Sequence, residues 1–254
     1  MNNVKVDWRI QVAYYRKFIF VIICTILAAV FFIVSYGINT ATNIGLIESS
    51  YNLIINPVFR GLTCLMYFLA AIISLYKLSF KRRTKHYLFF AFIALCFVEE
   101  IAVCFSLLAA MIIAFVALAF YFASCFLFKK IIWKRVPYVL IFYVFIFLLI
   151  NLLFALKVFE QNILYWVIAN FYGLLLFSNL AYAVSIFISV KDKHSLIPLL
   201  AIIFFSISDL LWMFVFFLPA SGVLLNSLVF FGMLSNYCSM FMNAFNLQKM
   251  LYFN

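Results

Sequence analysis

Residues 202–212 read IIFFSISDLLW, a long apolar run with one acid, Asp209, inside it. A second apolar run, LCFVEEI at residues 95–101, carries Glu99 and Glu100. An ionised carboxylate inside a lipid bilayer costs about 3 kcal/mol or more, so such side chains face a protein interior or a wet cavity. These two acidic positions therefore predict a helical membrane bundle and also mark the place where its function is expected.

The composition of the rest of the chain agrees with a membrane location. Of the 254 residues, 70% are hydrophobic and only 10% are charged, and the mean hydropathy is +1.22. A soluble domain with so few polar residues could not cover its own surface. The apolar runs are continuous rather than alternating, which favours helices over strands. The predicted fold class is all-α, a polytopic transmembrane helical bundle, and residues 1–254 are expected to form a single membrane domain.

Eight apolar runs are long enough to cross about 30 Å of hydrocarbon at about 1.5 Å of helix rise per residue. We expect the eight spans at residues 17–37, 58–80, 86–106, 107–128, 137–157, 163–190, 195–217 and 223–248. The third and fourth spans meet near Ser106, which predicts a tight helical hairpin. The connection at 38–56 is expected to be the only long loop on the outer side.

The basic residues indicate how the bundle is oriented. With eight spans, all but two of the 18 Lys and Arg residues fall on the side of both termini; the exceptions are Arg60 and Lys157. Cytoplasmic loops carry an excess of Lys and Arg, so both termini are predicted to be cytoplasmic. The net charge of +11 would suggest nucleic acid for a soluble protein, but here the expected partner is the lipid bilayer. The basic, Phe-, Ile- and Asn-rich composition favours a cell membrane, specifically a bacterial inner membrane.

Helix geometry places the acids near one level of the membrane. Glu99 lies roughly 18 Å, and Asp209 roughly 20 Å, from the start of its span. Arg60 enters from the opposite side, and its long side chain reaches inward. Adjacent residues on a helix point about 100° apart, so one of Glu99 and Glu100 is expected to be the working residue, and we slightly favour Glu100.

Two interpretations of this constellation remain open. Arg60 and one acid can form a buried ion pair that serves only helix packing. Three acids against one base, however, leave at least one carboxyl neutral or solvated, and a neutral carboxyl can act as a general acid. Asn236 and Tyr237, midway along the last run, are further candidates for the same cavity. The chain has only six Gly and no clustered metal ligands, so neither a nucleotide cofactor nor a metal is expected.

Three stretches have counterparts in one family of integral membrane proteins. FRGLT at 59–63 lies where that family has an aromatic or aliphatic residue followed by Lys-Pro-Leu-Thr, and FVEEI at 97–101 lies where it has a Gly-Asp pair. FFSISD at 204–209 is close to its Leu-Phe-x-x-Ser-Asp, and the last run, with Asn236 and Tyr237, is similar to its final Tyr-containing helix. The chain thus resembles the lysoplasmalogenase (YhhN-like) family over the whole eight-span layout. It departs from that family where Arg60-Gly61 replaces Lys-Pro and where the histidine of the fourth span has no counterpart.

The resemblance implies hydrolysis of the vinyl ether bond of lysoplasmalogens, with a membrane lysophospholipid as substrate. Glu100 and Asp209, with Glu99 beside them, would share proton donation and stabilisation of the cation, as the two carboxylates of glycosidases do. Arg60 would either bind the lipid phosphate near the outer interface or set the pKa of the acids, and Asn236 and Tyr237 would contact the substrate. No cofactor is implied, and the oligomeric state is left open.

Two other functions fit the same residues. A transporter or lipid-handling protein would use Glu99, Glu100 and Asp209 to bind protons or a cationic head group. A non-catalytic membrane subunit would use the acids to dock a partner helix, and they would then lie on the lipid-facing surface.

Overall fold

The computed structural model describes residues 8–46, 49–75, 84–128, 136–155, 163–190, 193–217 and 222–253. The described chain is helical throughout, apart from short turns. Most of the predicted basic clusters, including those within 76–83 and 129–135, lie outside these residues. The helices are α1 (Trp8–Asn43), α2 (Ser49–Leu75), α3 (Thr84–Ala102), α4 (Leu107–Phe128), α5 (Val136–Ala155), α6 (Ile163–Val190), α7 (Lys193–Phe217) and α8 (Gly222–Phe253).

The all-α prediction is confirmed, whereas the count of eight spans is not. Within the described residues, six helices are long and apolar enough to cross a membrane: α1, α2, α4, α6, α7 and α8. Helix α3 is not among the six, because its 19 residues include three charged ones, Lys85, Glu99 and Glu100. The predicted hairpin between α3 and α4 is present, with a short turn at residues 103–106.

The prediction of a long loop at residues 38–56 is wrong. Helix α1 continues to Asn43 and α2 already begins at Ser49. The polar residues of this stretch therefore lengthen both helices beyond their apolar runs. Gly45, with φ of +77°, makes the turn after α1, a backbone conformation in which glycine has no steric cost. One consequence is that Arg60 lies several turns inside α2 rather than near its start.

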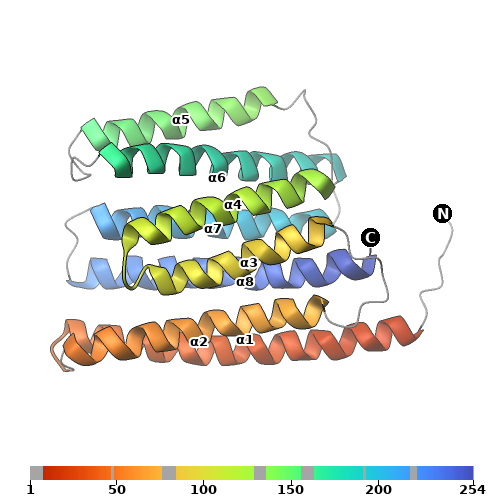
Figure 1. The fold of residues 1–254 in the computed structure, drawn as a ribbon, viewed down its shortest axis with the longest axis horizontal. Coiled ribbons are helices and arrows are strands. Elements are labelled where there is room, and N and C mark those ends of the chain that lie inside the picture. The colour runs from red at the N-terminus through yellow and green to blue at the C-terminus, as the bar shows by residue number, and fades with distance from the viewer. Residues whose placement is uncertain are drawn as a thin grey trace.

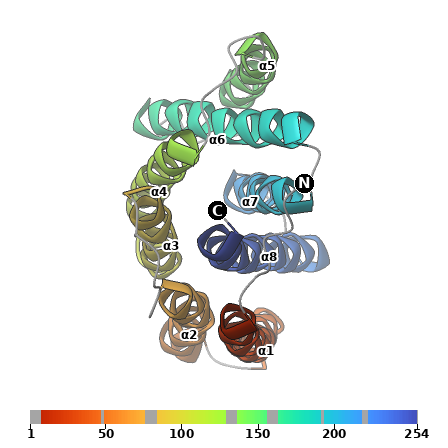
Figure 2. The ribbon, with the colours of Figure 1, turned by 90° about the vertical axis from the view of Figure 1, so that its right-hand side faces the viewer.

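Consecutive helices alternate in direction along the bundle (Figure 1). The start of α1 and the end of α8 lie at the same end of the molecule, opposite the α1–α2 and α3–α4 turns (Figure 1). Viewed along the helices, α7 and α8 are central, with α1 and α2 below, α5 and α6 above, and α3 and α4 along one side (Figure 2). This arrangement brings α2, α3, α6, α7 and α8 around a common interior.

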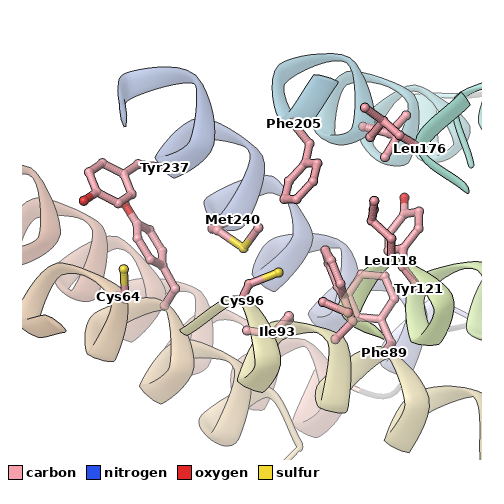
Figure 3. Close-up of a cluster of buried hydrophobic side chains, with 14 of the residues drawn as sticks. Cys64, Phe89, Ile93, Cys96, Leu118, Tyr121, Leu176, Phe205, Tyr237 and Met240 are labelled. Atoms are coloured by element: carbon pink, nitrogen blue, oxygen red, sulfur yellow. The ribbon is translucent and has the colours of Figure 1, made fainter. Parts of the chain in front are cut away.

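An aromatic core fills the middle of the bundle (Figure 3). Phe92 of α3 packs its ring 4.8 Å from that of Tyr121 on α4 and 6.3 Å from that of Phe205 on α7. Around these rings lie further buried side chains from the same helices and from α2, α6 and α8, which Figure 3 labels as Cys64, Phe89, Ile93, Cys96, Leu118, Leu176, Tyr237 and Met240. Phe205 and Leu176 also line the cavity described below, so the core forms one wall of the candidate site.

Hydrogen bonds between side chains and backbone join α4 to α6. The Tyr182 hydroxyl donates to the carbonyl oxygen of Cys125 at 2.7 Å, and Asn179 Nδ2 donates to the carbonyl oxygen of Leu118 at 3.2 Å. Both side chains are buried. In a membrane, where apolar burial between helices contributes little, such bonds and close packing hold helices together.

Replacing Tyr182 with Phe removes one of these bonds without creating a large cavity. We expect the free energy of unfolding in detergent micelles to fall by about 1 kcal/mol, the usual range for an interhelical hydrogen bond. The matched control is Tyr143→Phe, because the half-buried Tyr143 has no hydrogen bond from its hydroxyl among the described residues. Equal losses in the two variants would contradict a role for the Tyr182 bond.

Candidate active site

A cavity of about 160 Å³ lies where α2, α3, α4, α6, α7 and α8 approach one another. Its polar lining comes from Arg60, Glu99, Glu100, Tyr172, Ser208, Asp209 and Asn236. The rest of the lining is apolar, with side chains such as Met111, Leu176 and Phe205. We call it the acidic cavity. The three acids that the sequence singled out therefore line one cavity, rather than facing lipid as a partner-docking subunit would require.

Arg60 and Glu100 form a buried ion pair. Arg60 Nη2 lies 2.5 Å from Glu100 Oε2, and the two residues are only 7% and 4% exposed. The amide nitrogen of Asn236 donates a hydrogen bond to the other carboxylate oxygen of Glu100. Both oxygens of Glu100 are thus engaged, by donors from α2 and α8, which fixes this side chain in place.

Trp212 also contacts the guanidinium group of Arg60. The guanidinium carbon of Arg60 lies 5.2 Å from the centroid of the Trp212 ring, a cation–π arrangement. Trp212 follows Asp209 by three residues and therefore lies on nearly the same face of α7. Ser208 Oγ donates to the carbonyl oxygen of Gly232 at 2.9 Å, which fixes α7 against α8 beside this cluster.

Glu99 differs from its neighbour in its contacts. It lines the acidic cavity and is half-buried, but its carboxylate has no hydrogen bond or ion pair within the described residues. It interacts electrostatically with Glu100 and Asp209, both of which repel it when ionised. Glu99 is thus the carboxyl group of the cavity whose proton and lone pairs are available to a ligand.

Asp209 has one partner. The Tyr172 hydroxyl of α6 donates to Asp209 Oδ2 at 2.5 Å, and both side chains line the cavity. The second oxygen of Asp209 keeps its capacity to accept a bond from a ligand or water.

The sequence predicted some of this constellation and missed part of it. Arg60, Glu99, Glu100, Asp209 and Asn236 are together, and the partner of Arg60 is Glu100. Tyr237 is placed elsewhere: its ring stacks on Tyr67 at 5.8 Å and meets Phe32 edge-on at 5.2 Å, outside the cavity lining. Trp212 was missed, although its spacing of three from Asp209 was a usable signal.

The cavity supports acid–base chemistry on an amphipathic ligand. It offers one carboxyl without a partner, one hydrogen-bonded carboxylate and an apolar wall. A cavity of about 150 Å³ holds a molecule the size of benzene, so this one fits the reacting end of a lipid but not a whole chain. Among the described residues, no group of three His, Cys, Asp or Glu side chains could hold a metal ion.

Comparisons with known proteins add nothing to the geometry. No family model, no curated protein and no solved structure matches the chain. The assignment of function therefore rests on the site itself.

The two adjacent glutamates allow a matched test of the ion pair. Glu100→Gln leaves the buried Arg60 charge without its partner, so we expect the free energy of unfolding to fall by about 3–5 kcal/mol. Glu99→Gln leaves the pair of Arg60 and Glu100 intact and replaces a carboxyl that has no hydrogen bond or ion pair within the described residues, so stability should stay the same. Thermal unfolding in the same detergent measures both. Equal destabilisation by the two substitutions would contradict the pairing of Arg60 with Glu100 alone.

Proposed function

We propose that this chain is a membrane hydrolase of the lysoplasmalogenase kind, which cleaves the vinyl ether bond of lysoplasmalogens by carboxyl catalysis. The observation that carries the proposal is the unpartnered Glu99 opposite the Tyr172-bound Asp209 in one amphipathic cavity. A carboxyl pair of this kind suits a reaction that needs a proton donor and a cation stabiliser at one place.

The reaction fits these two roles. Protonation of the alkene carbon of a vinyl ether gives an oxocarbenium ion, to which water adds. The resulting hemiacetal loses the glycerophospho-base as an alcohol and releases a fatty aldehyde. Glu99 donates the proton, because its carboxyl has no bond that favours ionisation. Asp209, whose Oδ2 accepts a hydrogen bond from the Tyr172 hydroxyl, stabilises the cation in its carboxylate form and directs water to it.

Glu100 then has a positioning role instead of the catalytic role that we slightly favoured from the sequence. Each of its two oxygens already accepts a hydrogen bond, one from Arg60 and one from Asn236. Its charge keeps Arg60 buried, and its neighbour Glu99 carries the reactive group. The protein needs no cofactor for this reaction.

The wider proposal includes the membrane arrangement. The chain is a divergent member of the lysoplasmalogenase (YhhN-like) family, with eight spans and both termini in the cytoplasm of a bacterial cell. The basic connections between helices support this orientation through the positive-inside rule, and the start of α1 and the end of α8 lie at one end of the bundle, as an even number of spans requires (Figure 1). Its partners are the bilayer and a lysophospholipid substrate.

Replacing Asp209 with Asn should abolish aldehyde release, because the neutral amide cannot stabilise the oxocarbenium ion. Glu99→Gln, which removes the proton donor, should lower kcat by about 10²-fold or more. The measurement is mass-spectrometric detection of the aldehyde from a 1-alkenyl lysophospholipid, with purified protein shown to be folded by thermal unfolding.

The saturated 1-alkyl lysophospholipid is the matched substrate control, because it has no alkene to protonate and should give no aldehyde. Undiminished turnover in Asp209→Asn would remove the catalytic role of that residue. If folded wild-type protein releases no aldehyde, the proposed hydrolysis is wrong. The transporter or lipid-handling alternative would then be preferred, with Glu99 as the proton- or cation-binding group.

The proposed orientation has its own test. A reporter that is active only in the periplasm should stay inactive when it is fused after Asn254, and become active when it is inserted at Gly45, between α1 and α2. The inverse result would contradict cytoplasmic termini. If the reporter is active at both positions, or inactive at both, the two positions lie on the same side of the membrane. That result would contradict the proposed number of crossings between Gly45 and Asn254.

A further inference from the structure

A second cavity, of about 270 Å³, lies next to the acidic cavity and shares part of its lining. Its polar lining consists of Ser35 and Asn39 from α1 and Asn56 and Arg60 from α2. Apolar side chains of α7 and α8, such as Val215 and Val229, complete it. We call it the amide cavity. It contrasts with its neighbour because none of the described residues that line it is acidic.

The amide cavity presents hydrogen-bond donors to its interior. Ser35, which is 1% exposed, donates its hydroxyl proton to Asn56 Oδ1 at 2.6 Å. This bond orients the Asn56 amide so that Nδ2, a donor, has no hydrogen bond of its own within the described residues. Arg60 Nε is buried and likewise has no partner there, and the side chain as a whole is only 9% exposed.

An unpartnered buried donor is costly unless a ligand or water satisfies it. Here the donor belongs to a cation, and a second unused donor in the lining of the same cavity is the Asn56 amide. Because Glu100 takes only the Nη2 side of the guanidinium, the Nε edge remains for a second acceptor. This donor set suits a tetrahedral oxyanion, which accepts several charge-assisted hydrogen bonds at once.

The two cavities share three lining residues: Val103, Arg60 and Trp212. Arg60 therefore contacts both spaces, with its Glu100-bound edge beside the acids and its cation stacked on Trp212. A ligand that spans the boundary would place an anionic group on the amide side and an apolar, reactive group on the acid side. A single-chain phospholipid has this layout, since its phosphate is separated from the sn-1 linkage by only the glycerol backbone.

We propose that the amide cavity is a phosphate subsite, in which Arg60 and Asn56 bind the phosphodiester of a lysophospholipid whose sn-1 linkage reaches the acidic cavity. This inference rests on the proposed function for the identity of the lipid. The binding of phosphate itself depends only on the donors of the amide cavity. Asn56 is the residue that the sequence left unassigned, because it was expected to lie in a loop.

The test measures binding rather than turnover, so it does not depend on hydrolysis. Wild-type protein in nanodiscs is titrated with a non-hydrolysable 1-alkyl lysophosphocholine and with 1-alkyl glycerol, which has the same chain and no phosphate. We expect the phosphate-bearing lipid to bind about tenfold more tightly or better, the usual effect of a charge-assisted hydrogen bond.

Asn56→Asp is the matched variant, because it keeps the size of the side chain and the acceptor for Ser35 but replaces the donor with a negative charge. It should weaken binding of the lysophosphocholine by tenfold or more and leave 1-alkyl glycerol unchanged. Asn56→Leu, which removes the donor without adding charge, should show a smaller loss with the same selectivity. Thermal unfolding of both variants verifies that each is folded.

A third arm distinguishes the source of the phosphate. Inorganic phosphate should compete with the lipid only weakly if the ligand is a lipid head group. If inorganic phosphate binds as tightly as the lipid, the amide cavity is an anion site, but its ligand is a free anion and not a lipid head group. Equal affinities of wild-type protein for the two lipids, or equal losses of both in Asn56→Asp, would overturn the proposal. Tight, selective binding without any aldehyde release would retain this inference and contradict only the hydrolysis.

Discussion

The buried ion pair between Arg60 and Glu100 is the interaction on which the interior of this bundle depends. Each partner alone would be an isolated charge in a region of low dielectric, which is strongly unfavourable. Together, and with Asn236 on the second carboxylate oxygen and Trp212 beside the guanidinium, they fix α2, α3, α7 and α8 to one another. This polar cluster sets the relative placement of four helices that apolar contacts alone would specify weakly in lipid.

The same cluster divides the interior into two spaces of opposite character. On one side lie the carboxyl groups of Glu99 and Asp209, and on the other lie the amide and hydroxyl groups of α1 and α2. Arg60 belongs to both. The carboxyl groups on one side suit the acidic cavity to proton transfer. The neutral donors on the other side, together with Arg60, suit the amide cavity to the binding of an anion. An amphipathic lipid with a phosphate near its reactive bond has the same order of groups.

Sequence reasoning was most accurate for features that depend on local composition. Continuous apolar runs predicted helices, and the hairpin at Ser106 followed from two runs with almost no connection. It was less accurate where polar residues continue a helix beyond the apolar segment. The stretch 38–56 was assigned to a loop for this reason, although most of it belongs to α1 and α2, and Asn56 was therefore not considered as a site residue.

The sequence by itself determined that the chain is a helical membrane bundle with acids inside it, because an acid inside an apolar run has few other stable locations. It also identified Arg60, Glu99, Glu100, Asp209 and Asn236 as candidates. Only the tertiary structure decided their roles. Glu99 and Glu100 are adjacent and chemically identical, and they differ only in what lies opposite each: Arg60 and Asn236 meet Glu100, whereas Glu99 faces the cavity. The direction of a side chain on a helix can be read from the sequence, but the helices that it meets are set by packing across the whole bundle.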